Sequence, residues 1–254
     1  MKLEMNGKAL AAAVVAAPVA TVLGLNQYAK RLVATPEEQE KAYPGDDLLG
    51  EQSVSGGALA IDVDAPPEKI WPLLLQLGQD KAGFYSFSRF ERMAHFVIHN
   101  TYEPQERWQH LQVGDWVFYG AQGVGHQIAL MEPNRYLVGV SDTRNPPARE
   151  GAIAWCPPGL DMYAWTWGFF MEPRPGGGTR LISHTRVALS PAEAMPLQAK
   201  AVVGGWGWSS GVMTTRMLQV IKKCAEGRRS GLLYALYDGY ARFWDRIWGA
   251  HLPR

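Results

Sequence analysis

The sequence predicts an α+β protein in which one antiparallel sheet packs against helices. Three features support this class: a strand and a helix come first, a run of about five strands separated by turns follows, and a long helix closes the domain. The clearest strand, at 162–171, places four aromatic side chains on one face, namely Tyr163, Trp165, Trp167 and Phe169. The long helix is indicated at 209–226 by an apolar stripe that ends at Gly227.

Length and composition narrow the classes of function. The chain has 254 residues, of which 47% are hydrophobic, so it can bury a sizeable core and is not disordered as a whole. Lys and Arg number 25 and Asp and Glu number 24, which argues against a nucleic-acid partner bound through its phosphates. Two cysteines exclude a disulfide scaffold and a zinc site made of cysteines alone.

Residues 1–33 form a hydrophobic N-terminal segment, in which 9–25 carry no charge. A spanning helix needs about 20 apolar residues, so this stretch is a short candidate for an anchor, and we expect the protein to be membrane-associated through it. The alternative is a signal peptide, with export after cleavage, although Pro18 stands where the cleavage site needs a small residue. An Ala-rich helix packed on the protein is the third interpretation.

Residues 34–52 are polar and acidic, and their composition is typical of a linker before the main domain at 53–227. Within this linker, Thr35, a proline and two acidic residues predict the start of a short helix. The main domain opens with a strand at 54–63, and the helix that follows this strand ends at Gly78.

The middle of the domain begins with an aromatic loop at 83–100 that holds two histidines. Three strands follow, at 116–119, 126–131 and 135–141. The first two of them flank a turn that contains three glycines. A hairpin with a glycine-rich loop then joins the strands at 162–171 and 179–189.

Residues 228–254 are predicted to form an extra amphipathic helix at 231–249, with leucines and large rings on one stripe. From Lys222 onward seven residues are basic and three are acidic. A basic helix with a Trp and Tyr stripe suits a membrane interface. Packing on its own domain, or on a second copy of the chain, is the alternative.

Several segments, taken in order, carry a family resemblance: ATPEEQEKAYPGDDLL, IDVDAPPEKIWPLLLQLGQDKAGFYSFSRFE, LQVGDWV, the pair YAWTWGFFMEP and GGTRLISHTRV, and VMTTRMLQVIKKCAEG. Over about residues 34–227 the chain resembles the SRPBCC superfamily, which includes START lipid-transfer domains, the birch-pollen allergen group and aromatic polyketide cyclases or dehydratases. It is most similar to bacterial members of unassigned role. The resemblance implies a helix-grip fold, in which a curved antiparallel sheet wraps around a long C-terminal helix and leaves an apolar cavity.

The candidate ligand-binding residues are aromatic and polar side chains that could point into such a cavity. They come from the aromatic loop, the glycine turn and the paired strands: Tyr85, His95, Tyr119, His126, Tyr163, Trp165, Trp167, His184 and Arg186. Rings with a few hydrogen-bond donors suit a hydrophobic ligand with one polar group. A period of two does not tell which face of a strand lies inside, so His184 and Arg186 also fit a solvated outer face.

Other chemistries have less support in the sequence. His95 and His99 would share a face of a helix, but nothing fixes a third zinc ligand such as His126 or Asp115, so we expect no metal. No Gly-x-Ser-x-Gly elbow is present. The glycines at 120–125 join two strands rather than a strand and a helix, unlike a dinucleotide site, and we expect no cofactor.

The function that the sequence favours is a binding or carrier protein for a hydrophobic small molecule, such as a lipid or a polyketide-like compound. The alternative is a cyclase or dehydratase that acts on a polyketide-like substrate by general acid–base catalysis and needs an acid–base pair in the cavity. A third interpretation, a membrane scaffold, depends on the C-terminal helix. The pattern indicates neither a catalytic residue nor an oligomeric state.

Overall fold

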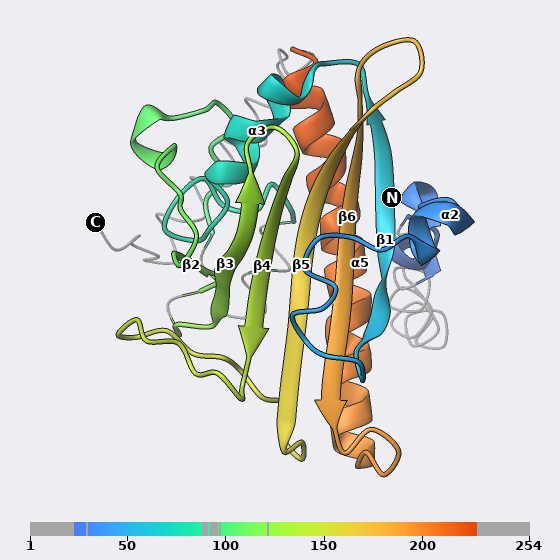
Figure 1. Cartoon of the computed structure of the whole chain (residues 1–254), viewed down its shortest axis with the longest axis vertical. Coiled ribbons are helices and arrows are strands. Elements are labelled where there is room, and N and C mark those ends of the chain that lie inside the picture. Colours follow the sequence, from blue (N-terminus) through green and yellow to red (C-terminus); the bar gives the residue numbers. More distant parts are fainter. Residues whose placement is uncertain are drawn as a thin grey trace, which may run out of the picture.

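The computed structural model describes residues 23–28, 30–87, 91, 96, 98–120 and 122–227. Its centre is a six-stranded antiparallel sheet in the order β1-β6-β5-β4-β3-β2, with a long helix along one face (Figure 1). The strands are β1 (Val54–Val63), β2 (Trp116–Phe118), β3 (Gly125–Glu132), β4 (Tyr136–Asp142), β5 (Met162–Pro173) and β6 (Thr179–Ser190). The helices are η1 (Lys30–Leu32), α2 (Pro36–Glu40), α3 (Pro67–Leu75), η2 (Glu106–Trp108) and α5 (Leu197–Ala225). The predicted α+β class, with its antiparallel sheet and long C-terminal helix, is confirmed.

Two predicted elements lie mostly or wholly outside the described residues: the apolar stretch up to residue 22 and the amphipathic helix at 231–249. Within the described ranges, no helix has both the length and the hydropathy that crossing a bilayer requires. Membrane association through either terminus therefore stays a prediction.

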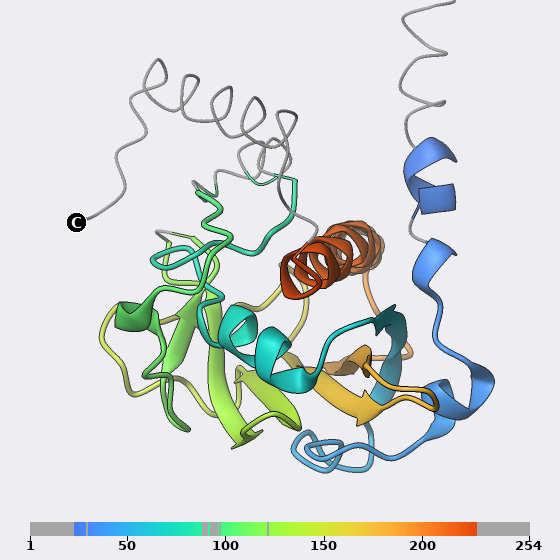
Figure 2. The ribbon, with the colours of Figure 1, turned by 90° about the horizontal axis from the view of Figure 1, so that it is seen from above.

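The register of β5 and β6 divides their side chains between the two faces of the sheet. Trp165 pairs with Val187, and Trp167 with Thr185, whereas His184 pairs with Gly168. Because side chains alternate along a strand, the two tryptophans share the inner face, toward α5, and His184 lies on the outer face. Figure 2 shows α5 on one side of the sheet and the loop before β1 on the other.

The second half of α5 closes the inner face near β1 and β6. Leu218 and Ile221 of the helix are fully buried in one apolar cluster with Leu181 of β6 and Val63 of β1. Helix α3 adds Leu74 to the same cluster. Because α5 packs chiefly against β1 and α3, the inner face of β3–β5 lies farther from the helix and carries large rings.

The chain before β1 (residues 34–52) covers the outer face and is part of the folded domain, although its composition is typical of a linker. Tyr43 is only 5% exposed, and its ring lies 4.5 Å from that of Phe170. Thr35 caps α2 as expected, since its side-chain oxygen accepts from the N–H of Glu38 at 3.2 Å. The Glu38 carboxylate accepts in turn from the N–H of Thr35 at 2.8 Å, which completes a capping box.

Helix α5 begins at Leu197 rather than at 209, so the predicted start was wrong. The reason lies in 204–211, GGWGWSSG, because each glycine costs a helix about 1 kcal/mol relative to alanine and four of them favour a loop. The helix nevertheless continues through them. A Cβ added at any of the four would meet nothing within 4 Å, so this half of α5 is loosely covered.

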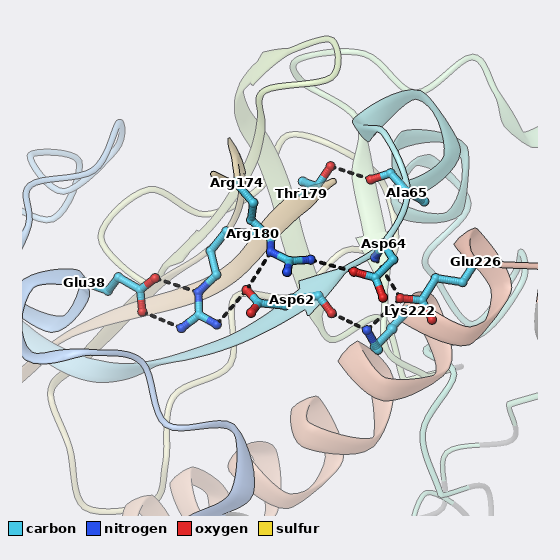
Figure 3. Close-up of polar contacts among 9 residues, drawn as sticks. All are labelled: Glu38, Asp62, Asp64, Ala65, Arg174, Thr179, Arg180, Lys222 and Glu226. Atoms are coloured by element: carbon cyan, nitrogen blue, oxygen red, sulfur yellow. Dashed lines mark hydrogen bonds and ion pairs between the residues drawn. The ribbon is translucent and has the colours of Figure 1, made fainter. Parts of the chain in front are cut away.

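Polar contacts fix the other end of α5 to β1 (Figure 3). Lys222 donates to the backbone oxygen of Asp62 and, at 2.6 Å, to the carboxylate of Glu226. On the other side of β1, Arg180 of β6 donates to Glu38 of α2 at 2.7 and 2.8 Å and to the Asp62 carboxylate at 3.2 Å. This connected set of charges links α2, β6, β1 and α5 and holds the helix over the β1 side of the sheet.

Candidate functional site

Four rings gather on the inner face of β3 and β5 and just beyond β2, and a ring from the aromatic loop covers them. We call this set the inner ring cluster: Phe84, Tyr119, His126, Trp165 and Trp167. Tyr119 stacks on Trp165 with ring centroids 5.7 Å apart, and Phe84 meets Tyr119 edge-on at 5.2 Å. His126 stands edge-on to Trp165 at 5.7 Å and to Trp167 at 6.0 Å. These distances are those of attractive ring pairs, so the cluster is one continuous apolar wall.

A polar pair lies inside this wall. The Tyr119 hydroxyl is 2.6 Å from Nδ1 of His126. The two side chains come together because the glycine turn between β2 and β3 folds the chain back, with Val117 opposite His126. Tyr119 is 8% exposed and His126 6%. Burial lowers the pKa of His126 to about 3 and raises the pKa of Tyr119 well above its usual value, so both groups are uncharged at neutral pH.

Gly139 of β4 makes room for the imidazole. A Cβ at this position would lie 2.0 Å from Cδ2 and 2.5 Å from Nε2 of His126, so only glycine lets the ring rest against the strand. Gly139 pairs with Trp167, which places the ring directly beside the tryptophans. Neither Gly139 nor Phe84 is among the predicted site residues. The position of Gly139 inside a predicted strand was a signal that another group approaches the backbone closely there. No sequence signal singled out Phe84.

Tyr163 extends the aromatic surface toward the first half of α5. It lies on the same strand face as Trp165, and its ring meets Trp155 edge-on at 6.1 Å. Trp155 in turn contacts Trp206 of α5 at 5.5 Å. Burial raises the pKa of Tyr163 to about 12, so its hydroxyl stays protonated. The inner ring cluster thus continues to the glycine-rich part of the helix.

Tyr85, a predicted site residue of the aromatic loop, has surroundings other than the inner ring cluster. Tyr85 is fully buried beside α3, where its hydroxyl accepts from Gln76 at 2.7 Å and donates to the backbone oxygen of Leu73 at 3.2 Å. Its ring stacks on Tyr102 rather than on the inner ring cluster. His95 lies outside the described residues. Tyr85 therefore ties the loop to α3.

His184 and Arg186 lie on the outer face, opposite the tryptophans. His184 packs against Tyr43, with ring centroids 4.8 Å apart, and its Nδ1 is 3.4 Å from the Asp46 carboxylate. Arg186 donates to the backbone oxygen of Ser53 at 2.6 Å. One cavity cannot be lined by both sets, so the predicted ligand-binding residues divide into an inner and an outer group.

A shallow groove of about 380 Å³ lies on this outer face, between α2 and β6. The residues that line it are mostly polar or charged and include Lys41, Asp46, Asp47, Glu51 and Arg186. Such walls do not suit an apolar ligand, because binding one there would desolvate charges without pairing them. The inner ring cluster is the better candidate site on chemical grounds.

Metal and thiol chemistry find no support among the described residues. Within them, no three His, Cys, Asp or Glu side chains come close enough together to hold a metal ion. Cys156 and Cys224 are partly buried and are not joined in a disulfide. Burial raises the pKa of the Cys156 thiol, which makes it a weaker nucleophile at neutral pH.

No family model and no curated protein matches the chain. Among solved structures, a conserved protein of unknown function from Enterococcus faecalis is 12% identical over 80% of this chain and 89% of that chain, with a TM-score of 0.36. A protein from Mesorhizobium loti is 17% identical over 66% of this chain and 96% of that chain, with a TM-score of 0.31. The di-domain ARO/CYC BexL from the BE-7585A biosynthetic pathway is 17% identical over 69% of this chain and 51% of that chain, with a TM-score of 0.34. At these identities and TM-scores the matches carry no argument about function, which has to be inferred from the chain's own residues.

Proposed function

We propose that the protein binds a hydrophobic small molecule against the inner face of β3–β5 and serves as a binding or carrier protein for it. The observation that carries this proposal is the inner ring cluster, in which stacked rings surround a single uncharged polar pair. A binding site for an apolar molecule with one polar group has this composition. Tyr119, His126 and Trp165 keep 6–8% of their surface accessible, whereas Leu218 and Ile221 of α5 keep none.

The alternative is a cyclase or dehydratase that acts on a polyketide-like substrate. It needs an acid–base pair in the site, and Tyr119 with His126 is such a pair by geometry. Their pKa values, however, move away from neutrality in both directions, which weakens the imidazole as a base and the phenol as an acid. This favours binding over catalysis. Turnover of an added polyketide-like ketone by the purified chain would reverse the preference.

Extraction of the purified protein with organic solvent, followed by mass spectrometry, tests the proposal. We expect a hydrophobic compound in near-stoichiometric amount, or quenching of tryptophan fluorescence when a naphthalene-type probe is added. The matched control is Trp208→Phe, because Trp208 is exposed on α5 and does not belong to the inner ring cluster. Absence of both a co-purifying compound and saturable probe binding would rule out the proposed function.

We further propose that the N-terminal segment attaches the protein to a membrane. The support is the uncharged stretch at 9–25. The full chain should sediment with membranes and require detergent for release, whereas a chain that starts at residue 30 should stay in the supernatant. A full-length chain that stays in the supernatant without detergent contradicts the attachment, and a recovered chain that starts after Ala20 indicates a cleaved signal peptide instead.

A further inference from the structure

His126 uses only one of its two ring nitrogens within the described part of the chain. Nδ1 faces the Tyr119 hydroxyl at 2.6 Å, and no described residue forms a hydrogen bond with Nε2. The imidazole is nevertheless 94% buried, because it is only 6% exposed. Trp165 and Trp167 stand edge-on to it, and an aromatic face is at best a weak acceptor. Nε2 is not one of the fully buried, unpaired side-chain atoms of the described residues, so it keeps some accessible surface and stays open to a partner.

The pair has two arrangements of its protons. In the first, the phenol donates to Nδ1, and Nε2 carries the imidazole hydrogen. In the second, Nδ1 donates to the phenol oxygen, and the phenol hydrogen then needs an acceptor of its own, which no described residue supplies. The second arrangement leaves both that hydrogen and the Nε2 lone pair unsatisfied, whereas the first leaves only the Nε2–H. Tyr119 therefore fixes His126 as a donor at Nε2.

We propose that the Nε2–H of His126 is the hydrogen-bond donor that holds the oxygen of the bound molecule, and that the molecule is a flat, uncharged ketone or ether. This inference rests on the proposed function and narrows its ligand class. The tryptophan rings suit a flat apolar body, and the single donor suits one acceptor oxygen. An ammonium group would meet a donor instead of an acceptor.

The probes that test this are 9-fluorenone and fluorene, which share a flat tricyclic body and differ in the carbonyl. Affinities for both are measured by tryptophan fluorescence with the full chain and with His126→Asn. The Asn oxygen takes the place of Nδ1 and still accepts from Tyr119, but nothing replaces the Nε2–H. We expect this change to weaken fluorenone relative to fluorene by about three- to tenfold, the value of one neutral hydrogen bond.

A matched variant keeps a donor near Nε2 and loses the acceptor for Tyr119. In His126→Gln the longer side chain carries an amide N–H near the position of Nε2 but loses the acceptor for Tyr119, so preference for fluorenone should return in part. If both probes bind and His126→Asn leaves their ratio unchanged, the inference is overturned while the proposed function stands. If neither probe binds the full wild-type chain, the proposed function fails and the inference fails with it.

A second measurement needs no substitution. Nitrogen NMR of the wild-type chain with labelled histidine reports which ring nitrogen of His126 carries the hydrogen at neutral pH. We expect Nε2 to be protonated and Nδ1 to be bare. A hydrogen on Nδ1 would overturn the assignment whatever the probes do.

Discussion

His126 ties the stability of the fold to pH. Burial lowers its pKa to about 3 in the native state, whereas the unfolded chain has a pKa of about 6.5 for this group. Between these values the unfolded chain binds a proton that the native chain does not. Stability contributed by the neutral imidazole is therefore complete above about pH 6.5 and is lost as the pH falls toward 3.

We expect this residue to contribute a slope of about 1.4 kcal/mol per pH unit to the free energy of unfolding below about pH 6.5. His126→Asn removes the titrating group and should flatten the slope. Part of the slope should remain, because burial also lowers the pKa of His184. Denaturant unfolding of both chains between about pH 7 and pH 4 measures the difference. Equal slopes in the two chains would mean that His126 is not held neutral.

Gly139 is the second residue on which the inner ring cluster depends. Gly139→Ala places a methyl group 2.0 Å from the imidazole, so the ring or the strand has to move. We expect a loss of about 1–3 kcal/mol in stability, typical of overpacking, and a weaker contact between Tyr119 and His126. The control is Gly56→Ala in β1, where the nearest neighbour of the added methyl is 3.3 Å away. Thermal unfolding should show a larger loss for Gly139→Ala than for the control, and equal losses would contradict the close approach.

At the scale of elements, the two ends of α5 differ: polar contacts hold its C-terminal end, whereas its first half is rich in glycine and loosely packed. Lys222 and Glu226 fix its C-terminal end to β1, whereas Gly204 and Gly207 lie in open space in its first half. Replacing both glycines with alanine should stabilise the protein by about 0.5–1 kcal/mol each, because alanine loses less backbone entropy in a helix. A higher thermal midpoint checks this. Gly227→Ala is the control and should destabilise, since Gly227 has φ +66° just after the helix.

The same elements show how far sequence reasoning reaches. Alternating side chains located β1 at Val54–Val63, as the structure has it. The start of α5 was missed because local glycine propensity opposed a helix that the tertiary fold keeps. The sequence also placed Tyr119 and His126 at the two ends of one turn, which the structure brings to 2.6 Å. It could not choose a face for His184, because a period of two is symmetric until the register with the neighbouring strand is known.

On the scale of the whole molecule, the sheet is covered on both faces, by α5 inside and by residues 34–52 outside. Tyr43 and Leu49, which are 5% and 2% exposed, cover outer residues such as Phe170 and Ala188. Each of these two side chains is worth about 1.5–3 kcal/mol of burial. The covering segment is therefore required for stability and is not merely a connection.

Truncation tests this requirement. A chain that starts at residue 30 keeps the covering segment and should unfold near the midpoint of the full chain. A chain that starts at residue 53 exposes the apolar outer face and should unfold at a lower temperature and aggregate. Thermal unfolding with light scattering compares the two. Equal midpoints and solubility would contradict the role given to Tyr43 and Leu49.

The most direct test of the central claim, that an apolar molecule binds at the inner ring cluster, is an NMR measurement of contacts between protons of 9-fluorenone and those of the full chain. Binding at this site predicts nuclear Overhauser contacts from the probe to the indole rings of Trp165 and Trp167 and to the His126 ring. Contacts confined to residues of the outer groove, such as Arg186 and Lys41, or no contacts at all at saturating probe, would contradict it.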